Sequence, residues 1–486
     1  MGIIRNQSIK NSISFYIGIG IGSINTILIY PNVFNEQPEH WGLLSILVAY
    51  ATLVSTFSSL GVPRIFIRFF PSIKEKGQLY FLSLITPLFG FIFSCLGYWF
   101  FKDELFVLLN ASPLLQENFF YIFLLVFLIS FYDLMTSVSH SYLDAITPIL
   151  INEVFHKLYC LIILLIHGFK FIDFTLFLQL YVCGFLLKLV LLFAIQFFRG
   201  NLFFRFSISA LRIKEILVYG FYVLIGGASL MLVSRVDMLM IGALLDLEDV
   251  AFYSLAFAIG SVIKVPGKSI VAISIPLLSK AWEENDLKKI KIIYYKSAIN
   301  QLIIGGVFFL CIWINIDAMF SLLPEKFSHG KWVVFYIGLS QLFNVASGVN
   351  GSIIVNSKYY KYDLFTNILL VFFTLVSNYI LIPKYGINGA AMATALSVLL
   401  FNIIRLILIK VKMGIHPFSK KTLYTVIIFL FIYLISTFIP LCGNLYLDVV
   451  WKTFIVIAIF IPLLLRLELS QDINEIVFDI RKRLGF

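Results

Sequence analysis

The sequence has few charged residues for its length. Asp, Glu, Lys and Arg make up only 13% of the 486 residues, hydrophobic residues make up 60%, and the mean hydropathy is +0.97. A water-soluble fold cannot bury that much apolar surface, so this composition excludes a soluble protein and indicates an α-helical membrane protein. The net charge of +11 does not indicate a nucleic-acid partner, because the basic residues lie in short loops between apolar runs, as cytoplasmic anchors do.

Cysteine is also scarce, and enzyme motifs are missing. The five cysteines are odd in number and form no Cys-x-x-Cys pair, so neither a disulfide framework nor a metal site is expected. The sequence contains no Gly-x-Ser-x-Gly, no His-Glu-x-x-His and no phosphate-binding glycine loop. We therefore expect no catalysis, no cofactor and no bound metal.

Apolar runs long enough to cross a bilayer recur along the whole chain, since about 20 residues suffice for one crossing. We predict about fourteen transmembrane spans, with no soluble domain between them. They cover residues 12–34, 41–63, 78–100, 118–139, 148–167, 174–197, 216–245, 250–275, 297–316, 332–356, 363–382, 389–410, 421–440 and 451–467. Roughly 29 of the 37 Lys and Arg residues fall in one set of alternate loops and inner span ends, and such a bias marks the cytoplasmic side. An even number of spans then places both termini in the cytoplasm.

A weak internal repeat divides the spans into two halves. Val62-Pro63 ends the second span and Val265-Pro266 lies in the eighth, which matches spans one to six with spans seven to twelve. Parallel repeats of this kind are a transporter architecture, with the site between the halves. A proline in a span permits a kink, so both prolines are predicted to mark bends used in switching.

The predicted fold class is therefore an all-α integral membrane protein with two six-helix lobes and two further C-terminal helices. The predicted domains are residues 1–200, residues 201–410, and residues 411–486, which include a cytoplasmic tail.

The predicted span 216–245 carries two ionisable residues, Arg235 and Asp237. An ionisable residue inside a span costs about 2.5–3.5 kcal/mol on insertion scales, so each needs a partner or a function. Residues two positions apart on a helix do not face each other, so an ion pair between them is not expected. Either each side chain ties this helix to a neighbouring helix, or at least one of them lines a polar central cavity.

Basic pairs occur at matching places in the two halves. Arg64 and Arg68 lie four residues apart at the inner end of span two, and Lys264 and Lys268 lie four apart in span eight. Like charges on one helix face repel each other, so each pair needs water or an anion opposite it. If the two halves face each other, Arg64 and Lys264 would offer phosphate oxygens two cationic partners. The alternative, favoured for Arg68 and Lys268, is that the side chains extend to the inner headgroups.

Further polar residues lie inside the apolar runs. Glu153 and Lys157 are four residues apart and are predicted to pair with each other. Asp133 is either a proton or cation site or a residue that hydrogen-bonds across the bundle. The remaining candidates are Asn25, His156, Lys188, Asn344 and Arg405.

Three stretches carry a resemblance to a known family. They are the opening of the chain with residues 18–31, the run from Arg235 to Gly242 with residues 249–254, and the run from Ile382 to Ser397. With them the chain resembles polysaccharide-biosynthesis flippases of the multidrug/oligosaccharidyl-lipid/polysaccharide exporter superfamily over nearly its whole length. The resemblance implies alternating access in the inner membrane of a bacterium. It also implies an undecaprenyl-diphosphate-linked oligosaccharide as cargo, with the lipid tail in a hydrophobic groove. By motif it covers only Arg235 and Asp237.

The predicted function is to flip this lipid-linked oligosaccharide for the assembly of a surface polysaccharide such as O-antigen. Arg235, Lys264 and Arg64 are expected to bind the diphosphate in one cavity, and Asp237 and Asp133 to have coupling or structural roles. The expected partners are the lipid-linked cargo, the bilayer and polysaccharide assembly proteins, without nucleic acid, and the chain is expected to be a monomer.

Three alternatives stay open. A multidrug or metabolite cation antiporter of the same fold would prefer acidic cavity residues. A lipid II flippase would carry a chemically close cargo. A membrane enzyme of envelope assembly would need a catalytic base or a large outer loop.

Overall fold

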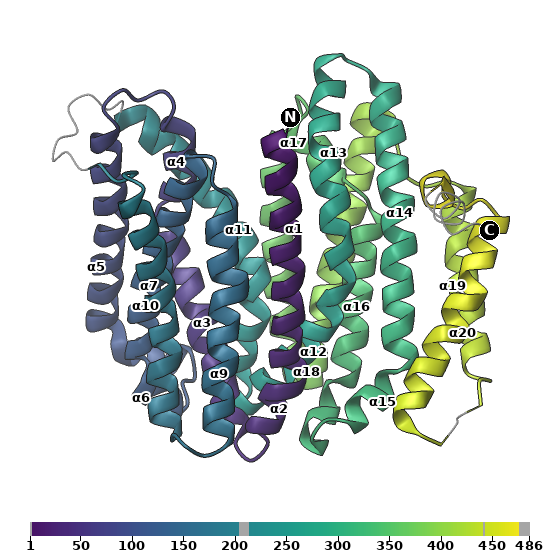
Figure 1. Ribbon diagram of the computed structural model, residues 1–486, viewed down its shortest axis with the longest axis horizontal. Coiled ribbons are helices and arrows are strands. Elements are labelled where there is room, and N and C mark those ends of the chain that lie inside the picture. The colour runs from purple at the N-terminus through teal and green to yellow at the C-terminus, as the bar shows by residue number, and fades with distance from the viewer. Residues whose placement is uncertain (1, 204–212, 441–442, 476–486) are drawn as a thin grey trace. The chain divides into compact units, whose positions relative to one another are not determined.

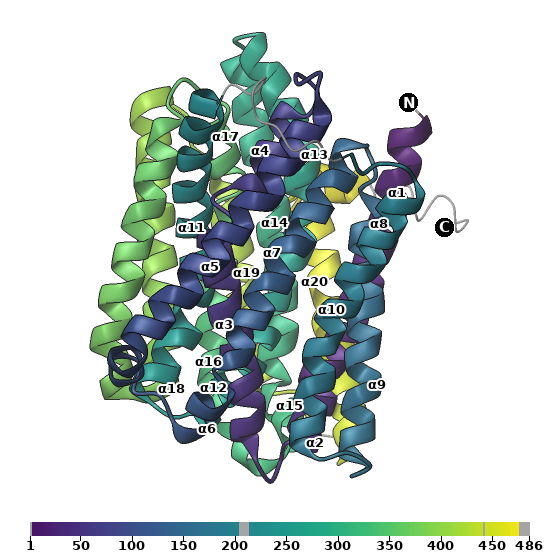
Figure 2. The same cartoon turned by 90° about the vertical axis from the view of Figure 1, so that its left-hand side faces the viewer.

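The computed structural model describes residues 2–203, 213–440 and 443–475, without the side chains of residues 2–12 and 230. These residues form helices joined by short turns and loops (Figures 1 and 2), and no strand occurs among them. The earlier helices are α1 (Gly2–Ser23), η1 (Ile24–Ile29), α2 (Tyr30–Val33), α3 (Pro38–Ser58), α4 (Val62–Phe69), α5 (Lys76–Leu108), α6 (Pro113–Asn118), α7 (Phe120–Ser141), α8 (Ile146–Ile149), η2 (Leu150–Phe155), α9 (His156–Gly168), α10 (Phe174–Phe198) and α11 (Ile213–Leu244). The later helices are α12 (Leu247–Ser261), η3 (Val262–Lys264), α13 (Val265–Glu283), α14 (Leu287–Ile314), α15 (Ile316–Ser321), η4 (Glu325–Gly330), α16 (Lys331–Ala346), α17 (Asn350–Val355), α18 (Lys361–Met413), α19 (Lys420–Ser436) and α20 (Leu445–Arg466). The predicted all-α class is confirmed; the end of the predicted tail, residues 476–486, lies outside the described residues.

The helices include many that suit a membrane. Among the described residues, 10 helices are long and apolar enough to cross one, or up to 11 if the bent pair Ile213–Ser229 and Met231–Leu244 forms a single span. The protein is therefore a multi-pass membrane protein. Two predicted spans correspond to helices of only 16 residues (α16) and 17 residues (α19), which is short for a full crossing. The total of fourteen crossings stays a prediction.

One long helix, α18, contains two of the predicted spans. Its backbone is not helical at Gly386, where φ is 58° and ψ is −140°, a conformation open to glycine because it lacks a Cβ atom. The hydroxyls of Ser377 and Ser397 lie 3.2 Å apart on either side of this turn, and Arg405 reaches back to Thr366. The two halves of α18 therefore run antiparallel, with the turn inside the loop predicted between residues 382 and 389.

The chain divides into two compact units, the first ending at Leu255 and the second beginning at Ala256, so the boundary falls within α12. In the first unit, α7 packs against α3, α4, α5 and α10, and α1 packs against η2. In the second unit, α14 packs against α13, α16 and α19, and α16 packs against α18. The domain limits predicted from the sequence, at residues 200 and 410, stay predictions.

Polar residues fix where several helices begin. The Asp173 side chain accepts a hydrogen bond from the backbone N–H of Leu176 at the start of α10. Ser419 and Thr422 form a capping box at the start of α19, and Asn444 caps α20. Each cap satisfies N–H groups that a helix end leaves without partners. The sequence thus encodes these ends locally, where a polar loop gives way to an apolar run.

Helix breaks lie beside both prolines of the predicted repeat. In the first unit, α3 ends at Ser58, Gly61 has a φ of 75°, and Pro63 lies in the first turn of α4. In the second unit, the 3-10 helix η3 separates α12 from α13, and Pro266 lies in the first turn of α13. Proline has no N–H to donate, and the first turn of a helix does not require one. A role of these breaks in switching stays a prediction.

Candidate functional site

A pocket in the second unit opens beside the first turn of α13. Its volume is ≈ 440 Å³, within the range of small-ligand pockets. It is lined by Lys264, Gly267, Lys268, Val271, Ala272, Ile275, Gln301, Asn344, Val345, Gly348, Val349, Gly351 and Ser352. None of these residues is acidic. We call this the cationic pocket, because Lys264 and Lys268 are the charged residues among those that line it.

The lysines of the cationic pocket come from one helical face. Lys264 is half-buried at the end of η3, and Lys268 is exposed one turn later. Lys264 has no hydrogen bond or ion pair with the residues that the structure describes, and its Nζ atom lies 6.0 Å from the centroid of the Phe257 ring. Two like charges one turn apart repel each other, and a bound anion would relieve that repulsion. Lys268, for which a headgroup contact was favoured, thus lines the same pocket as Lys264.

A buried amide in the cationic pocket lacks a partner. Gln301 on α14 is 4% exposed, and its Nε2 atom donates no hydrogen bond within the described part of the chain. A Cβ atom added to Gly267 would lie 2.9 Å from Oε1 of Gln301, so glycine makes room for the amide beside α13. Leaving a buried polar group unpaired costs about 1–3 kcal/mol, which a hydrogen-bonding ligand would recover. Sequence reasoning did not name Gln301, whose only signal was a polar residue in an apolar run.

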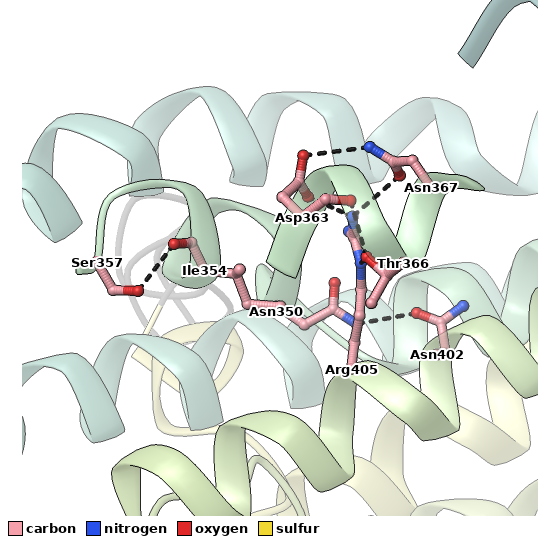
Figure 3. A network of polar contacts seen from close by, with 8 residues as sticks. All are labelled: Asn350, Ile354, Ser357, Asp363, Thr366, Asn367, Asn402 and Arg405. Atoms are coloured by element: carbon pink, nitrogen blue, oxygen red, sulfur yellow. Dashed lines mark hydrogen bonds and ion pairs between the residues drawn. The ribbon is translucent and has the colours of Figure 1, made fainter. Parts of the chain in front are cut away.

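Figure 3 shows the polar contacts of a buried arginine that lies next to Gly351, one of the residues that line the cationic pocket. Arg405 on α18 is 7% exposed and forms an ion pair with Asp363. Its Nε atom donates to the Thr366 hydroxyl at 3.2 Å, and Nη2 donates to Oδ1 of Asn367 at 3.2 Å. A Cβ atom on Gly351, which lines the pocket, would lie only 2.6 Å from Nη1 of Arg405. The guanidinium thus packs directly behind the pocket wall, and its contacts are structural.

A second contact in Figure 3 joins the same wall to α18. Asn350, in the first turn of α17, donates from Nδ2 to Oδ1 of Asn402 at 2.9 Å, and both residues are buried. Together with the packing of Arg405 beside Gly351, this contact holds α17 against the second half of α18. The short helix that supplies Gly351 and Ser352 to the cationic pocket is therefore held by buried polar contacts.

The structure gives the two ionisable residues of α11 different surroundings. Asp237 is 5% exposed and accepts a hydrogen bond from the Tyr253 hydroxyl at 2.7 Å, so it ties α11 to α12. Arg235 is half-buried and has no hydrogen bond or ion pair among the described residues; Tyr181 on α10 lies close enough for an electrostatic interaction. The contact of Asp237 is therefore structural. Arg235 is a cation without a hydrogen-bond or ion-pair partner among the described residues.

The basic pair of the first unit lies on α4. Arg64 is exposed and forms no hydrogen bond or ion pair with the described residues. Arg68 is also exposed, and its guanidinium stacks on the Tyr219 ring at 4.2 Å from the centroid. Arg64 and Arg235 belong to the first unit and Lys264 to the second. That these three line one cavity stays a prediction.

A polar cluster lies among the membrane helices of the first unit. Glu153 and Lys157 form the predicted ion pair at 2.7 Å, which confirms that prediction. The Lys157 ammonium also donates to the backbone oxygen of Gly18 at 2.9 Å, and Nδ2 of Asn25 donates to the backbone oxygen of Lys157 at 3.0 Å. These contacts join α9 and η2 to α1 and η1.

The same cluster contains an enclosed lysine. Lys188 on α10 is 6% exposed, and its Nζ atom donates to Oδ1 of Asn152 at 3.1 Å. The ammonium also lies 4.6 Å from the ring centroid of Tyr132 and 4.5 Å from that of Phe185. Asp133 is exposed, and its charge acts on Lys188 without a direct ion pair. Sequence reasoning named Lys188 and Asp133 separately and missed that α7 and α10 bring them together.

Two π-helical segments coincide with this cluster. The segment η1 carries Asn25, and η2 carries Asn152 and Glu153. Short π-helical turns are rare and occur frequently at functional sites. In this protein they supply three of the polar side chains inside the membrane helices.

The class of protein that this fold defines is a multi-pass, all-α membrane protein. The sequence profile described as polysaccharide biosynthesis protein matches residues 8–282, more than half of the chain, and the chain belongs to this family. A second profile, MatE, matches residues 223–380. Both matches and the structures below support a flippase or transporter of the MOP superfamily, as the sequence resemblance implied.

Relatives of known sequence or structure agree with this assignment. An uncharacterised membrane protein of Methanocaldococcus jannaschii is 24% identical over 289 residues, which are 56% of this chain and 54% of that protein, so the match spans about half of the relative. The lipid II flippase MurJ in an inward closed conformation has a TM-score of 0.73 at 15% identity, with 95% of this chain and 100% of that chain covered. An inward-facing multidrug resistance MATE family transporter of the MOP superfamily has a TM-score of 0.64 at 13% identity, with 84% and 98% covered. At these identities the likeness establishes the fold.

Proposed function

We propose that this protein flips an undecaprenyl-diphosphate-linked oligosaccharide across the cytoplasmic membrane by alternating access, for surface polysaccharide assembly. The observation that carries the proposal is the cationic pocket, in which Lys264 lacks an internal counter-charge and Gln301 lacks a hydrogen-bond partner. A diphosphate offers charged oxygens to the lysines and acceptors to the amide. A transporter of organic cations would require the opposite charge in this pocket.

Capture and release place opposite demands on such a site. Long-range attraction by Lys264 and Lys268 draws the diphosphate from the inner leaflet. Release requires contacts that are few or that differ between two conformations, because a ligand shifts an equilibrium only through its differential affinity for the two states. We assign Arg235 and Arg64 as further cationic contacts for the diphosphate. Asp237 is assigned a structural role through Tyr253.

Export of surface polysaccharide in a complemented deletion strain tests this proposal. We expect Lys264→Ala and Arg235→Ala to abolish polymer export at normal protein level, and Lys264→Arg to retain part of it because the charge persists. Lys289→Ala is the matched control, since Lys289 pairs with Glu284 at an exposed position. Normal polymer from both neutral variants would refute the anion site.

The family and the structural relatives are transporters rather than enzymes. One structural relative favours a second candidate cargo, lipid II. The chain is similar over 95% of its length to the lipid II flippase MurJ, whose name gives lipid II as its cargo. Complementation of a strain depleted of its lipid II flippase separates the two cargoes: growth would indicate lipid II, and restored polymer in the deletion strain would indicate the oligosaccharide.

The proposed location is the inner membrane of a bacterium, with both termini in the cytoplasm and a monomeric chain that works with polysaccharide assembly proteins. Cysteine labelling or reporter fusions after Lys76, Gly330 and Phe486 test the orientation, the last of these outside the described residues. We expect the first and last positions to be cytoplasmic, because the Lys and Arg bias places them there. A Phe486 fusion accessible from outside would overturn the topology.

A further inference from the structure

The anion proposal does not use Lys188, although a buried ammonium in a membrane segment needs a reason. We propose that the Lys188 ammonium is the resident cation of the polar cluster in the first unit, which contains Asn152, Glu153 and Lys157. This ammonium takes the place that a dissociable metal cation such as Na⁺ would need beside Asp133. This inference goes beyond the proposed function, because it concerns the ion dependence of the first unit and not the cargo.

The surroundings of Nζ suit an ammonium group. Its contacts with the described residues include a hydrogen bond to the amide oxygen of Asn152 at 3.1 Å and the faces of Tyr132 and Phe185, whose centroids lie at 4.6 and 4.5 Å. Aromatic faces attract ammonium groups through the ring quadrupole, whereas hard metal cations require a shell of oxygen ligands. The site is therefore built for the organic cation that occupies it.

The charges of the polar cluster balance without an external ion. Glu153 has its own partner in Lys157 at 2.7 Å. Asp133 is the other carboxylate that acts on Lys188, so the cluster holds two carboxylates and two ammonium groups. A metal cation bound at Asp133 would add a positive charge to a balanced cluster, close to an ammonium that is only 6% exposed. Repulsion between the two cations would oppose its binding.

The other titratable groups near Lys188 do not change this balance. Cys160 and His156 of α9 are close enough to interact with it. The Sγ atom of Cys160 lies 3.8 Å from Nε2 of His156, and the His156 ring packs against Phe185 with centroids 4.6 Å apart. A thiol and an imidazole supply no fixed negative charge. Asp133 therefore stays the counter-charge of Lys188.

The first test is a salt titration of the purified full-length protein. A ligand that binds the folded state raises the melting temperature in a saturable manner. We expect NaCl and choline chloride at equal ionic strength to give the wild-type protein and Asp133→Asn the same difference in melting temperature. A saturable stabilisation by Na⁺ that Asp133→Asn abolishes would overturn the proposal. This test requires no Lys188 variant to fold and measures no export, so its outcome is independent of the proposed cargo.

The second test removes the resident cation and replaces it. Lys188→Ala deletes three methylene groups and the ammonium, which together correspond to n-propylammonium. We expect this variant to lose thermal stability and to regain it in a saturable manner with n-propylammonium, but not with 1-propanol. Lys188→Met is the matched control, because its side chain fills much of the same space without charge, and it should not respond. Equal effects of propanol and propylammonium, or the absence of any recovery, would refute the resident-cation role.

Discussion

Two groups of polar residues, one in each unit, differ in whether their charged side chains have partners. In the first unit, Glu153 pairs with Lys157, and Lys188 is enclosed by an amide and two aromatic rings. In the second unit, Lys264 lines a pocket without an acidic residue, next to the unpaired amide of Gln301. A polar group away from water needs a partner. Glu153, Lys157 and Lys188 obtain their partners from the chain itself, whereas Lys264 and the Gln301 amide nitrogen have none among the described residues.

The difference is not a general property of the second unit. Arg405 lies in that unit and is compensated by Asp363, Thr366 and Asn367. Conversely, Arg64 and Arg235 in the first unit lack such partners among the described residues. The comparison therefore distinguishes structural cations, which have partners, from cations available to a ligand. Lys264, Arg64 and Arg235, three of the proposed diphosphate contacts, are of the second kind.

Removal of the Arg405 guanidinium should have the largest effect on stability. We expect Arg405→Ala to lower the free energy of unfolding by about 3–5 kcal/mol, because it leaves a partly buried carboxylate without its partner. Arg405→Lys should lose part of that amount, since an ammonium cannot reproduce the fork of contacts. Denaturant titration of the purified protein measures both. Unchanged stability of Arg405→Ala would show that this cation is not structural.

Breaking the ion pair of the first unit should cost less. We expect Glu153→Gln and Lys157→Met each to lower the free energy of unfolding by about 1–3 kcal/mol, because each leaves a partner unpaired. The double variant should lose less than the sum of the two, and a double-mutant cycle measures that coupling. Strict additivity would mean that the pair is not a unit, and the contrast with the cationic pocket would fail.

Gln301 provides the sharpest test of the comparison, because its removal should affect function and not stability. We expect Gln301→Leu not to lower the free energy of unfolding, since an apolar side chain replaces a buried amide nitrogen without a partner, and to reduce polymer export. Gln196→Leu is the matched control: Gln196 is 0% exposed, donates to the Ser139 hydroxyl at 3.1 Å and accepts from Asn201 at 2.8 Å. Equal losses of stability in the two variants would show that Gln301 is a structural residue.

The smallest effect is expected outside the membrane, at Asp472 after α20. Burial raises the pKa of Asp472, but the hydrogen bonds from Lys296 and Asn300 and the Lys296 charge outweigh it, so the pKa lies below its ordinary value. The contact therefore stabilises the folded state above about pH 4, the ordinary range of an aspartate, and is lost as the pH falls through the lower folded pKa. Asp472→Asn should cost only about 0.2–1 kcal/mol, as for other exposed pairs. Unfolding measured from pH 3 to pH 8 checks this; a contribution that disappears above pH 5 would contradict the assignment.

The sequence by itself determined the class of the protein and its local contacts. Apolar runs of about 20 residues must become helices in a bilayer, because every backbone N–H and C=O needs a partner within the segment. The spacing of Glu153 and Lys157 places them on one helix face, so their ion pair follows from helix geometry alone. The same spacing places Lys264 and Lys268 on one helix face. The helix breaks near Pro63 and Pro266 follow from proline, which has no backbone N–H to donate.

Only the tertiary structure decided which helices bring their polar groups together. Lys188 and Asn152 are 36 residues apart, and Tyr253 and Asp237 are 16 apart. Helices that are apolar on nearly all sides do not show in their sequence which face meets a neighbour, so these pairs depend on how the helices rotate and pack. For the same reason Gln301 was not predicted, since its role depends on the space that Gly267 of another helix leaves for it.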